Sequence, residues 1–354
     1  MNYDPTPERR ALAEAALSRA LALEPDLPEV HLTYAHHIDR IDLDYERARE
    51  QLSIARRGLP NDAVAIALEA DIDRRQGQWE KAIQELKDAI TRDPRNSTFV
   101  QKLAFTFSYT RQFRDAEQMF DRLIELRPDE PLLKTAKALY VNYYETGDDS
   151  AFWTVIAAFP ASMADDRAAI NLQLMFALVD RDWVRTKEFI TKMNGGDDET
   201  DFAYAGSTVP VDCYSILLAR LQREPISADA SFAGAREQLN QKVQKSPGRA
   251  DLLSQLAVVD ALLNNKKTAI AEAKRAVEML PISKDALDGS LIELNLAVVY
   301  GWTNELDLAF ETLNSLAKVP GELNYGTLKR DPYWEPLGQD PRYEKLLAEL
   351  APRG

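Results

Sequence analysis

The sequence of 354 residues is poor in cysteine, glycine and long apolar runs. A single cysteine, Cys213, excludes a disulfide bond within one chain. Only 14 glycines stand against 47 alanines and 44 leucines, and this balance favours helix because glycine is costly there. No apolar run approaches the roughly 18 residues of a membrane span, and the polar N-terminus (Met-Asn-Tyr-Asp-Pro) does not resemble a signal peptide. We therefore expect a soluble helical chain.

Positive charge is also in short supply. The 43 lysine and arginine residues are outnumbered by 57 aspartate and glutamate residues, which gives a formal net charge of −14 at pH 7. An acidic chain repels the phosphates of nucleic acids and the surface of anionic membranes. We expect neither of them as a direct partner of this chain. The expected compartment is the cytoplasm, and a periplasmic position stays open if a membrane-anchored half precedes the chain.

Candidate metal ligands are few and badly spaced. Counted from His31, the other two histidines, His36 and His37, lie five and six residues away, whereas helical metal sites usually use an i, i+4 pair. An acidic segment within 194–209 lacks the spacing, the central glycine and the final glutamate of a calcium-binding loop. Its carboxylates are Asp197, Asp198, Glu199 and Asp201. We interpret this segment as a solvated acidic loop, and we expect no metal and no cofactor.

Motifs of catalysis are missing from the sequence as well. It contains no phosphate-binding loop, no nucleophile elbow and no dinucleotide-binding glycine pattern. Cys213 has no histidine near it in the sequence and shares an apolar helical pattern with Ile216 and Leu217. This pattern is typical of a buried structural thiol. The sequence thus predicts a protein that is not an enzyme.

The sequence does contain an internal repeat, which proline marks. Pro60, Pro94 and Pro128 lie thirty-four positions apart, and so do Pro247 and Pro281. Pro25 precedes Pro60 by thirty-five positions. The residue twelve positions before each of these six prolines is alanine: Ala13, Ala48, Ala82, Ala116, Ala235 and Ala269. A recurrence at one fixed period indicates a repeat architecture rather than a bias of composition.

The spacing within each unit indicates two packed helices. Positions twelve, eight and five before the proline are mostly alanine or leucine, and these steps of four and three place them on one helical face. The small residue allows a neighbouring helix to approach closely, and the proline ends the helix. A second small residue, at Ala70, Ala104 and Ala257, lies twenty-four positions before its proline and marks an upstream partner helix. Gly77 separates the two helices of one unit.

These features resemble the tetratricopeptide repeat. The segment Gly77-Gln-Trp-Glu-Lys-Ala-Ile83, which continues to Asp93 and Pro94, is close to the signature of that family, and the segment 111–116 repeats it with arginine in place of glycine. The resemblance implies an all-α, right-handed superhelical solenoid of about eight helical hairpins, some of them degenerate, with a C-terminal capping helix.

The repeats divide the chain into four expected regions. Residues 7–130 form an N-terminal array that starts with an unpaired second helix, and 131–209 hold degenerate hairpins and the acidic loop. Residues 210–320 form the C-terminal units, and 321–354 form a cap. Asp340 and Pro341 predict that a closing helix begins there and runs to about Leu350. The unpaired first helix leaves an apolar face open, which suggests self-association.

Both ends of the chain, together with Arg74-Arg75-Gln76-Gly77, resemble a group of bacterial signalling proteins. In these proteins a winged-helix regulator, a nucleotide cyclase or a kinase carries a tetratricopeptide array at its C-terminal end. The resemblance implies that this chain is the regulatory or sensory half of such a system. No catalytic or DNA-binding half lies within the sequence.

In the family, the first helix of each hairpin lines a concave groove. Transferred to this sequence, that geometry selects a stripe of residues at steps of three or four. The stripe consists of Thr33, His37 and Arg40; Ala67, Asp71 and Arg74; Gln101, Phe105 and Tyr109; Leu139, Asn142 and Tyr143. Charged, amide and aromatic groups together suit a peptide-binding surface, although a solvated face without a ligand would look the same. The stripe does not match the lysine, arginine and asparagine set that grips chaperone C-termini.

Two classes of function remain. The first is a non-enzymatic scaffold that binds a protein or peptide partner, as a segment or helix, in the groove. The second is a receptor for a small molecule or short peptide, with a pocket in the irregular region 160–246. An enzyme is disfavoured because no nucleophile–base pair is visible.

Overall fold

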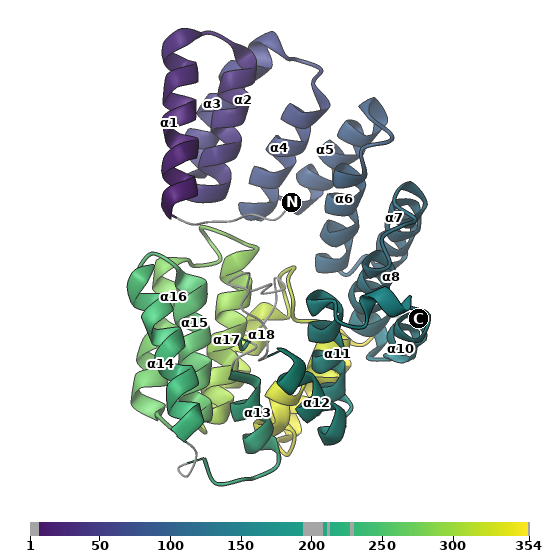
Figure 1. The fold of residues 1–354 in the computed structure, drawn as a ribbon, viewed down its shortest axis with the longest axis vertical. Coiled ribbons are helices and arrows are strands. Elements are labelled where there is room, and N and C mark those ends of the chain that lie inside the picture. Colours follow the sequence, from purple (N-terminus) through teal and green to yellow (C-terminus); the bar gives the residue numbers. More distant parts are fainter. Residues whose placement is uncertain (1–6, 194–207, 211–212, 227–229, 353–354) are drawn as a thin grey trace. The chain divides into compact units, whose positions relative to one another are not determined.

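The computed structural model describes residues 7–193, 208–210, 213–226 and 230–352, and the regular structure in these ranges is entirely helical (Figure 1). This confirms the expected all-α fold of paired helices. Contacts divide the chain into a first unit, Met1–Thr106, and a second unit, Phe107–Gly354. The four regions expected from the sequence stay a prediction. Most of the expected acidic loop, at 194–207, lies outside the described residues.

No helix in these ranges has both the length and the apolar character needed to cross a membrane.

The first unit consists of antiparallel helices, one of which ends in a π-helical turn. Its elements are α1 (Pro7–Leu23), α2 (Pro28–His37), the π-helix η1 (Ile38–Asp42), α3 (Tyr45–Gly58), α4 (Ala63–Arg75), α5 (Trp79–Arg92) and α6 (Ser97–Tyr109), whose last three residues belong to the second unit.

The second unit begins and ends with regular hairpins and has short, irregular helices between them. Its first elements are α7 (Phe113–Leu126), α8 (Leu132–Lys137), the π-helix η2 (Ala138–Tyr143), α9 (Tyr144–Thr146), α10 (Ser150–Ala157), the 3₁₀ turn η3 (Ala161–Met163), α11 (Arg167–Val179) and α12 (Trp183–Met193). They are followed by α13 (Tyr214–Leu221), α14 (Ala230–Lys245), α15 (Ala250–Leu262), α16 (Lys266–Met279), α17 (Asp288–Trp302), α18 (Leu306–Leu316), α19 (Tyr325–Arg330), the 3₁₀ turn η6 (Pro332–Leu337) and α20 (Pro341–Leu350).

The helix boundaries follow the proline spacing of the sequence. Helices α6 and α7 begin and end one repeat period after α4 and α5. Helices α15 and α16 also match α4 and α5, with an offset equal to the distance in sequence between Pro94 and Pro281. The predicted close-approach alanines explain this regularity: Ala48, Ala82, Ala116 and Ala269 are fully buried. Larger side chains at these four positions would push neighbouring helices apart.

Helix α1 departs from this rule. Its alanine at the equivalent position, Ala13, is exposed, and Leu12 beside it is 70% exposed. Helix α1 packs on α2 but has no described helix on its other side within the first unit. Self-association through this face stays a prediction.

The turns between paired helices need one residue in the left-handed region. Gly77 fills this position between α4 and α5 with φ 73°, and Arg111 and Asn264 fill the equivalent positions with φ 59° and 65°. Glycine adopts this conformation freely, whereas a side chain makes it less favourable. Arginine at position 111 therefore needs another reason, which its contacts in the second unit provide.

The longer interval between Pro25 and Pro60 also has a structural counterpart. The first helix of that repeat ends in the π-helix η1, which accommodates one more residue than an α-helix of the same length. The inserted residue is thus absorbed within the helix rather than in a loop.

The expected C-terminal cap is present. Asp340 caps α20 by accepting a hydrogen bond from the backbone N–H of Arg342, and Pro341 is the first residue of that helix. Trp334 and Leu337 are buried in the core that contains α17 and α18. Cys213 is fully buried as well.

Candidate functional site

The first helices of the repeats carry the candidate site of the first unit. We call this surface the first-helix face; it comprises the predicted groove residues of α2, η1, α4 and the part of α6 that belongs to the first unit, and the charged residues that contact them. Thr33 and Arg40 are exposed, and His37 is partly buried. Arg74, Gln101 and Phe105 are partly buried, whereas Ala67 and Asp71 are buried. Ala67 thus contributes packing rather than contact surface.

Asp71 connects successive first helices through charge. Lys102 of α6 donates a hydrogen bond to its carboxylate, and an Arg74 guanidinium nitrogen lies 3.7 Å from a carboxylate oxygen. Burial opposes ionisation of Asp71, but the positive charges of Lys102 and Arg74 outweigh it and hold its pKa below the ordinary value. Sequence reasoning selected Asp71 and Arg74 but missed Lys102.

The π-helix η1 adds a buried acid to the same region. Asp39 is fully buried, neither of its carboxylate oxygens has a hydrogen-bond partner, and its ion pair with Arg75 is long, at 3.9 Å. Burial therefore raises its pKa to about 6. Desolvation, and after it the charges of Arg40 and Lys102, lower the pKa of His36 nearby. Although the chain is acidic overall, the two acids Asp39 and Asp71 are surrounded here by four cationic side chains. These are Arg40, Arg74, Arg75 and Lys102.

The other predicted groove residues lie in the second unit, where the chain itself covers part of the surface. Tyr109 and Asn142 are partly buried, but Leu139 and Tyr143 are 5% and 1% exposed. Tyr143 donates its hydroxyl hydrogen bond to Asp331 of the C-terminal segment. Leu139 and Tyr143 therefore present no free surface to a partner in this arrangement. The sequence analysis selected them because the repeat spacing alone cannot reveal a segment that folds back from far along the chain.

A buried aspartate recurs at one repeat position. Asp39, Asp73 and Asp260 each lie twenty-one positions before a repeat-ending proline, and all three are fully buried. Arg49 of α3 pairs with Asp73, and Arg236 of α14 forms a two-pronged pair with Asp260 at 2.8 and 2.7 Å. Each arginine comes from the second helix of the preceding repeat, so each pair joins two successive repeats.

A glutamate completes each of these clusters. Glu85 lies against Asp73 and Glu272 against Asp260, each nine positions before its proline. One oxygen of each glutamate is buried without a hydrogen-bond donor. Burial and the neighbouring carboxylate raise the pKa of both glutamates to about 8, so each holds a proton at neutral pH that can bridge the two acids.

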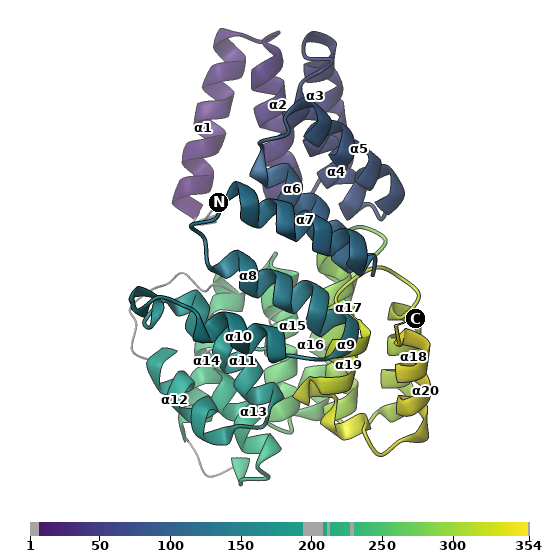
Figure 2. The same ribbon diagram turned by 90° about the vertical axis from the view of Figure 1, so that its right-hand side faces the viewer.

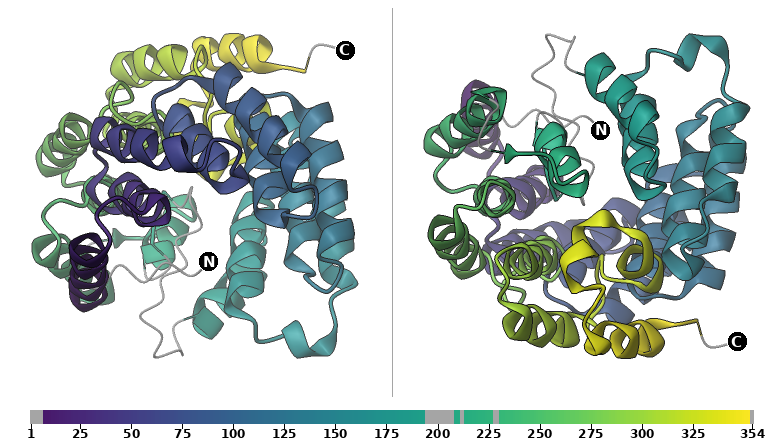
Figure 3. Two further views of the ribbon diagram at one scale, coloured as in Figure 1. Left: turned by 90° about the horizontal axis from the view of Figure 1, so that it is seen from above. Right: turned by 90° about the horizontal axis from the view of Figure 1, so that it is seen from below.

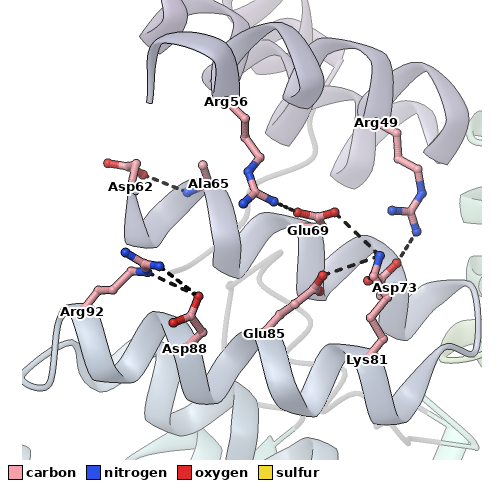
Figure 4. A network of polar contacts seen from close by, with 10 residues as sticks. All are labelled: Arg49, Arg56, Asp62, Ala65, Glu69, Asp73, Lys81, Glu85, Asp88 and Arg92. Atoms are coloured by element: carbon pink, nitrogen blue, oxygen red, sulfur yellow. Dashed lines mark hydrogen bonds and ion pairs between the residues drawn. The ribbon is translucent and has the colours of Figure 1, made fainter. Parts of the chain in front are cut away.

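Figure 4 shows the cluster of the first unit, in which side chains of α3, α4 and α5 converge. Lys81 lies between the acids, with its Nζ 2.9 Å from Asp73, 3.6 Å from Glu85 and 3.7 Å from Glu69. Arg56 pairs with Glu69 at its edge. The equal spacing of these residues in the two units was a signal in the sequence that the proline alignment could have revealed.

A pocket of about 380 Å³ lies within the second unit. Its lining combines aromatic, aliphatic and polar groups: Trp153, Ile156, Ala157, Gln173, Arg185 and Phe189. The Arg185 guanidinium lies 5.4 Å from the ring centre of Trp153, whose indole N–H donates to Asp180 at 2.8 Å. The pocket overlaps only in part with the region 160–246 in which the sequence predicted one.

One described group has the composition of a metal site. Single ligand atoms of Glu14, His37 and Asp42 lie within 4.8 Å of one another. Arg10 donates to both carboxylates at 2.8 Å, so its positive charge already occupies the position that a cation would take.

Comparison with known proteins identifies the repeat in part of the chain. Residues 73–140, from α4 to η2, match the family model of the tetratricopeptide repeat. Solved structures with similar helices include yeast Tom70, with 14% identity over 95% of this chain and 81% of that chain and a TM-score of 0.44. Another belongs to pilF of Pseudomonas aeruginosa, with 16% identity, coverage of 53% and 84%, and a TM-score of 0.41. A tetratricopeptide repeat protein from Parabacteroides merdae has 12% identity, coverage of 91% and 98%, and a TM-score of 0.32.

Identities and TM-scores this low say nothing about what the chain binds. No curated protein matches the sequence. For residues 73–140, the family match confirms the resemblance to the tetratricopeptide repeat that the segments 77–94 and 111–116 carry.

Proposed function

We propose that this chain is a non-enzymatic scaffold that binds a protein or peptide segment on the first-helix face of its first unit. Tetratricopeptide repeats generally mediate protein–protein interaction, and the match at residues 73–140 includes part of this face. The observation that carries the proposal is the junction at Asp71, where α4 meets Lys102 of the next first helix and the charge of Arg40 from the preceding one. Successive first helices thus form one charged surface.

The chemistry of this surface suits a segment with acidic and apolar groups. Arg40 is exposed, so its guanidinium group is placed to receive a carboxylate, and Phe105 offers an aromatic contact. The Arg74 side chain, which is 12% exposed and pairs with Asp71, adds positive charge to the same surface. The four cationic side chains of this face outnumber its two buried acids, so positive charge stays in excess although each acid reduces the local electrostatic potential. Binding of an extended segment or a helix fits this pattern equally well.

A double substitution on the first-helix face tests the proposal. We expect Arg74→Glu with Phe105→Ala to weaken capture of the partner from native lysate at least tenfold, because it removes one charged and one aromatic contact. Quantitative mass spectrometry of the captured proteins is the measurement, and circular dichroism checks that the fold is retained. Arg57→Glu with Phe113→Ala, which changes one charged and one aromatic residue outside the set that defines this face, is the matched control. Equal capture by the wild type and both variants would contradict the site.

The proposal extends to a regulatory or sensory role in a bacterial signalling system. Its support is the resemblance of both chain ends and of Arg74-Arg75-Gln76-Gly77 to that group. A captured partner that is neither a regulator, a cyclase nor a kinase, nor a component that acts on one, would count against this part.

The pocket near Trp153 supports a second candidate function, a receptor for a small ligand. An aromatic wall with one arginine suits a compound that has an apolar body and an anionic group. A true ligand at 100 times its Kd should raise the unfolding free energy by about 2.7 kcal/mol. Thermal-shift screening of anionic metabolites and short peptides measures this, with Arg185→Gln as the control variant. Stabilisation of equal size in Arg185→Gln would place the ligand elsewhere.

A further inference from the structure

A tyrosine-lined surface in the second unit is covered by the chain's own C-terminal segment. The end of α6, η2 and α9 supply the tyrosines; the ring centres of Tyr109 and Tyr140 lie 6.4 Å apart, and those of Tyr140 and Tyr144 lie 5.0 Å apart. Residues 317–331, which we call the clasp, pass over this surface, and α19 of the clasp lies beside α9 (Figure 2). Seen from below in Figure 3, the yellow C-terminal segment lies between the green helices and the teal helices of this unit.

Arg111 holds the first part of the clasp by its backbone. Its guanidinium donates to the carbonyl oxygens of Ala317 and Val319, at 3.1 Å each, and of Leu323 at 2.9 Å. The backbone N–H of Gly321 donates in turn to the carbonyl oxygen of Tyr109 at 3.1 Å. Arg111 occupies the left-handed turn position that Gly77 fills in the preceding hairpin. The unfavourable conformation of a non-glycine residue there is consistent with selection for these contacts.

Two acid–tyrosine pairs hold the rest of the clasp. The hydroxyl of Tyr144 donates to Glu322, and that of Tyr143 donates to Asp331. Between them, Gly326 approaches α9 so closely that a Cβ atom there would lie 1.6 Å from the carbonyl oxygen of Tyr143. The clasp therefore fits this surface through contacts that only glycine allows at its centre.

Burial favours the protonated form of the two carboxyl groups of the clasp, although the tyrosine hydroxyls that donate to them oppose it. Glu322 faces the hydroxyls of Tyr109 and Tyr144, and burial raises its pKa to about 7. Burial likewise raises the pKa of Asp331 to about 7, with Tyr143, Glu322 and Arg330 as its neighbours.

Arg330 compensates little of this charge because other acceptors engage it. Its guanidinium donates to the carbonyl oxygen of Gly147 at 3.0 Å, to Asp149 at 3.3 Å and to Asp180 at 2.8 Å. Loss of both clasp protons would therefore leave two buried carboxylates, and Arg330, which faces Asp331, is already engaged by other groups.

The clasp also has an independent attachment. The indole N–H of Trp302 in α17 donates to the carbonyl oxygen of Tyr333 at 3.0 Å, and Arg342 of α20 pairs with Asp307 of α18 at 2.7 Å. The segment that follows the clasp is thus fixed to the last hairpin by contacts that do not involve α9. Release from α9 would leave this attachment in place.

We propose that residues 317–331 form a releasable clasp that occupies the tyrosine-lined surface of the second unit and leaves this surface on release. Rising pH favours release, because ionised Glu322 and Asp331 return to water. Acidification favours the closed form. The device is separate from the first-helix face and does not depend on the function proposed for it.

Hydrogen–deuterium exchange of the full chain at pH 6.0 and 8.5, corrected for the intrinsic effect of pH, tests the release. We expect exchange in residues 138–147 and 317–331 to rise at least tenfold at pH 8.5, while α15 and α16 stay protected. The double variant Glu322→Gln, Asp331→Asn keeps both acceptors but cannot ionise, so it should stay closed at both pH values. A rise that persists in this variant, a rise shared by all of the second unit, or no rise would overturn the proposal.

A peptide provides a second readout. In the full-length variant Gly326→Ala the clasp cannot seat, so a labelled synthetic peptide of residues 317–331 with the native glycine should bind that variant at pH 6.0, measured by fluorescence anisotropy. The wild type should bind it at least tenfold more weakly, because its own clasp competes. The same peptide with alanine at position 326 is the control. Equal binding of both peptides, or no binding to a variant that circular dichroism shows to be folded, would also overturn the proposal.

Discussion

The free energy of unfolding is expected to fall as the pH rises from 5 to 8. Among the described residues, seven carboxyl groups, Glu293 among them, have raised pKa values in the folded chain, mainly because of burial. The pKa values of the other six are about 8 for Glu85 and Glu272, about 7 for Glu322 and Asp331, and about 6 for Asp39 and Asp149. In the unfolded chain the same groups return to ordinary values near 4. Unfolding between pH 5 and 8 therefore releases protons, and a higher pH favours the unfolded state.

The size of the effect follows from the number of protons released. One pKa unit corresponds to about 1.4 kcal/mol, so an average release of a single proton over these three pH units lowers stability by about 4 kcal/mol. The lowered pKa of His36 acts in the opposite direction, but it concerns one group against seven. The lowered pKa values of Asp71 and Asp73 matter only below about pH 4, where protonation of these acids weakens their ion pairs.

Urea unfolding at pH 5, 6, 7 and 8, followed by circular dichroism, measures this dependence. Glu85→Gln with Glu272→Gln should flatten it, because glutamine stays neutral at every pH and resembles the protonated glutamate in shape. Lys87→Gln with Lys274→Gln is a control of equal substitution number on the same two second helices. Stability that stays constant or rises between pH 5 and 8 in the wild type would show that these carboxyl groups ionise freely in the folded chain.

The regular hairpins were predictable because their chemistry is local. Ala82 and Pro94 are twelve positions apart, and the helix between them needs only one small contact position and one residue that stops it. The equal helix boundaries of α4, α6 and α15 follow from the same spacing. The longer interval before Pro60 also signalled an insertion, but sequence reasoning could not distinguish a π-helical turn from a longer loop.

The clasp could not be predicted in the same way. Tyr143 and Asp331 are 188 residues apart, and neither belongs to a repeat signature. Tyr143 therefore looked like a groove residue, whereas the structure buries it under α19. Arg111 did carry a hint, since it replaces glycine in a turn that favours glycine. The charged partners Asp39 and Lys102 were missed because the expected stripe followed a regular helix, whereas Asp39 lies in a π-helix and Lys102 lies beside the stripe.

The buried aspartate position should give effects of opposite sign in different repeats. Asp260→Ala removes a two-pronged pair with Arg236 and a hydrogen bond from Asn265 at 2.7 Å. We expect a loss of about 3 kcal/mol, the lower end for removing one partner of a buried pair, measured by urea unfolding at pH 7. Release of Glu272 from its acidic neighbour should partly compensate, because its carboxylate can then pair with Arg236. The double variant Asp260→Ala, Glu272→Gln should therefore be less stable than Asp260→Ala alone.

Asp39→Asn tests the same repeat position where the arginine is missing. The residue that corresponds to Arg49 and Arg236, eleven before the repeat-ending proline, is Glu14 in this case, and Asp39 has no hydrogen bond. Its carboxylate is therefore buried without a hydrogen-bond donor; its ion pair with Arg75 is long, at 3.9 Å, and Arg40 and Lys102 act on it only through their charge. The neutral amide should leave stability at pH 7 unchanged or raise it by about 1 kcal/mol, since it removes the cost of burying a charge. A loss of stability as large as that of Asp260→Ala would contradict this prediction. It would mean that the long ion pair between Asp39 and Arg75 stabilises the repeat as much as the hydrogen-bonded pair between Asp260 and Arg236 does.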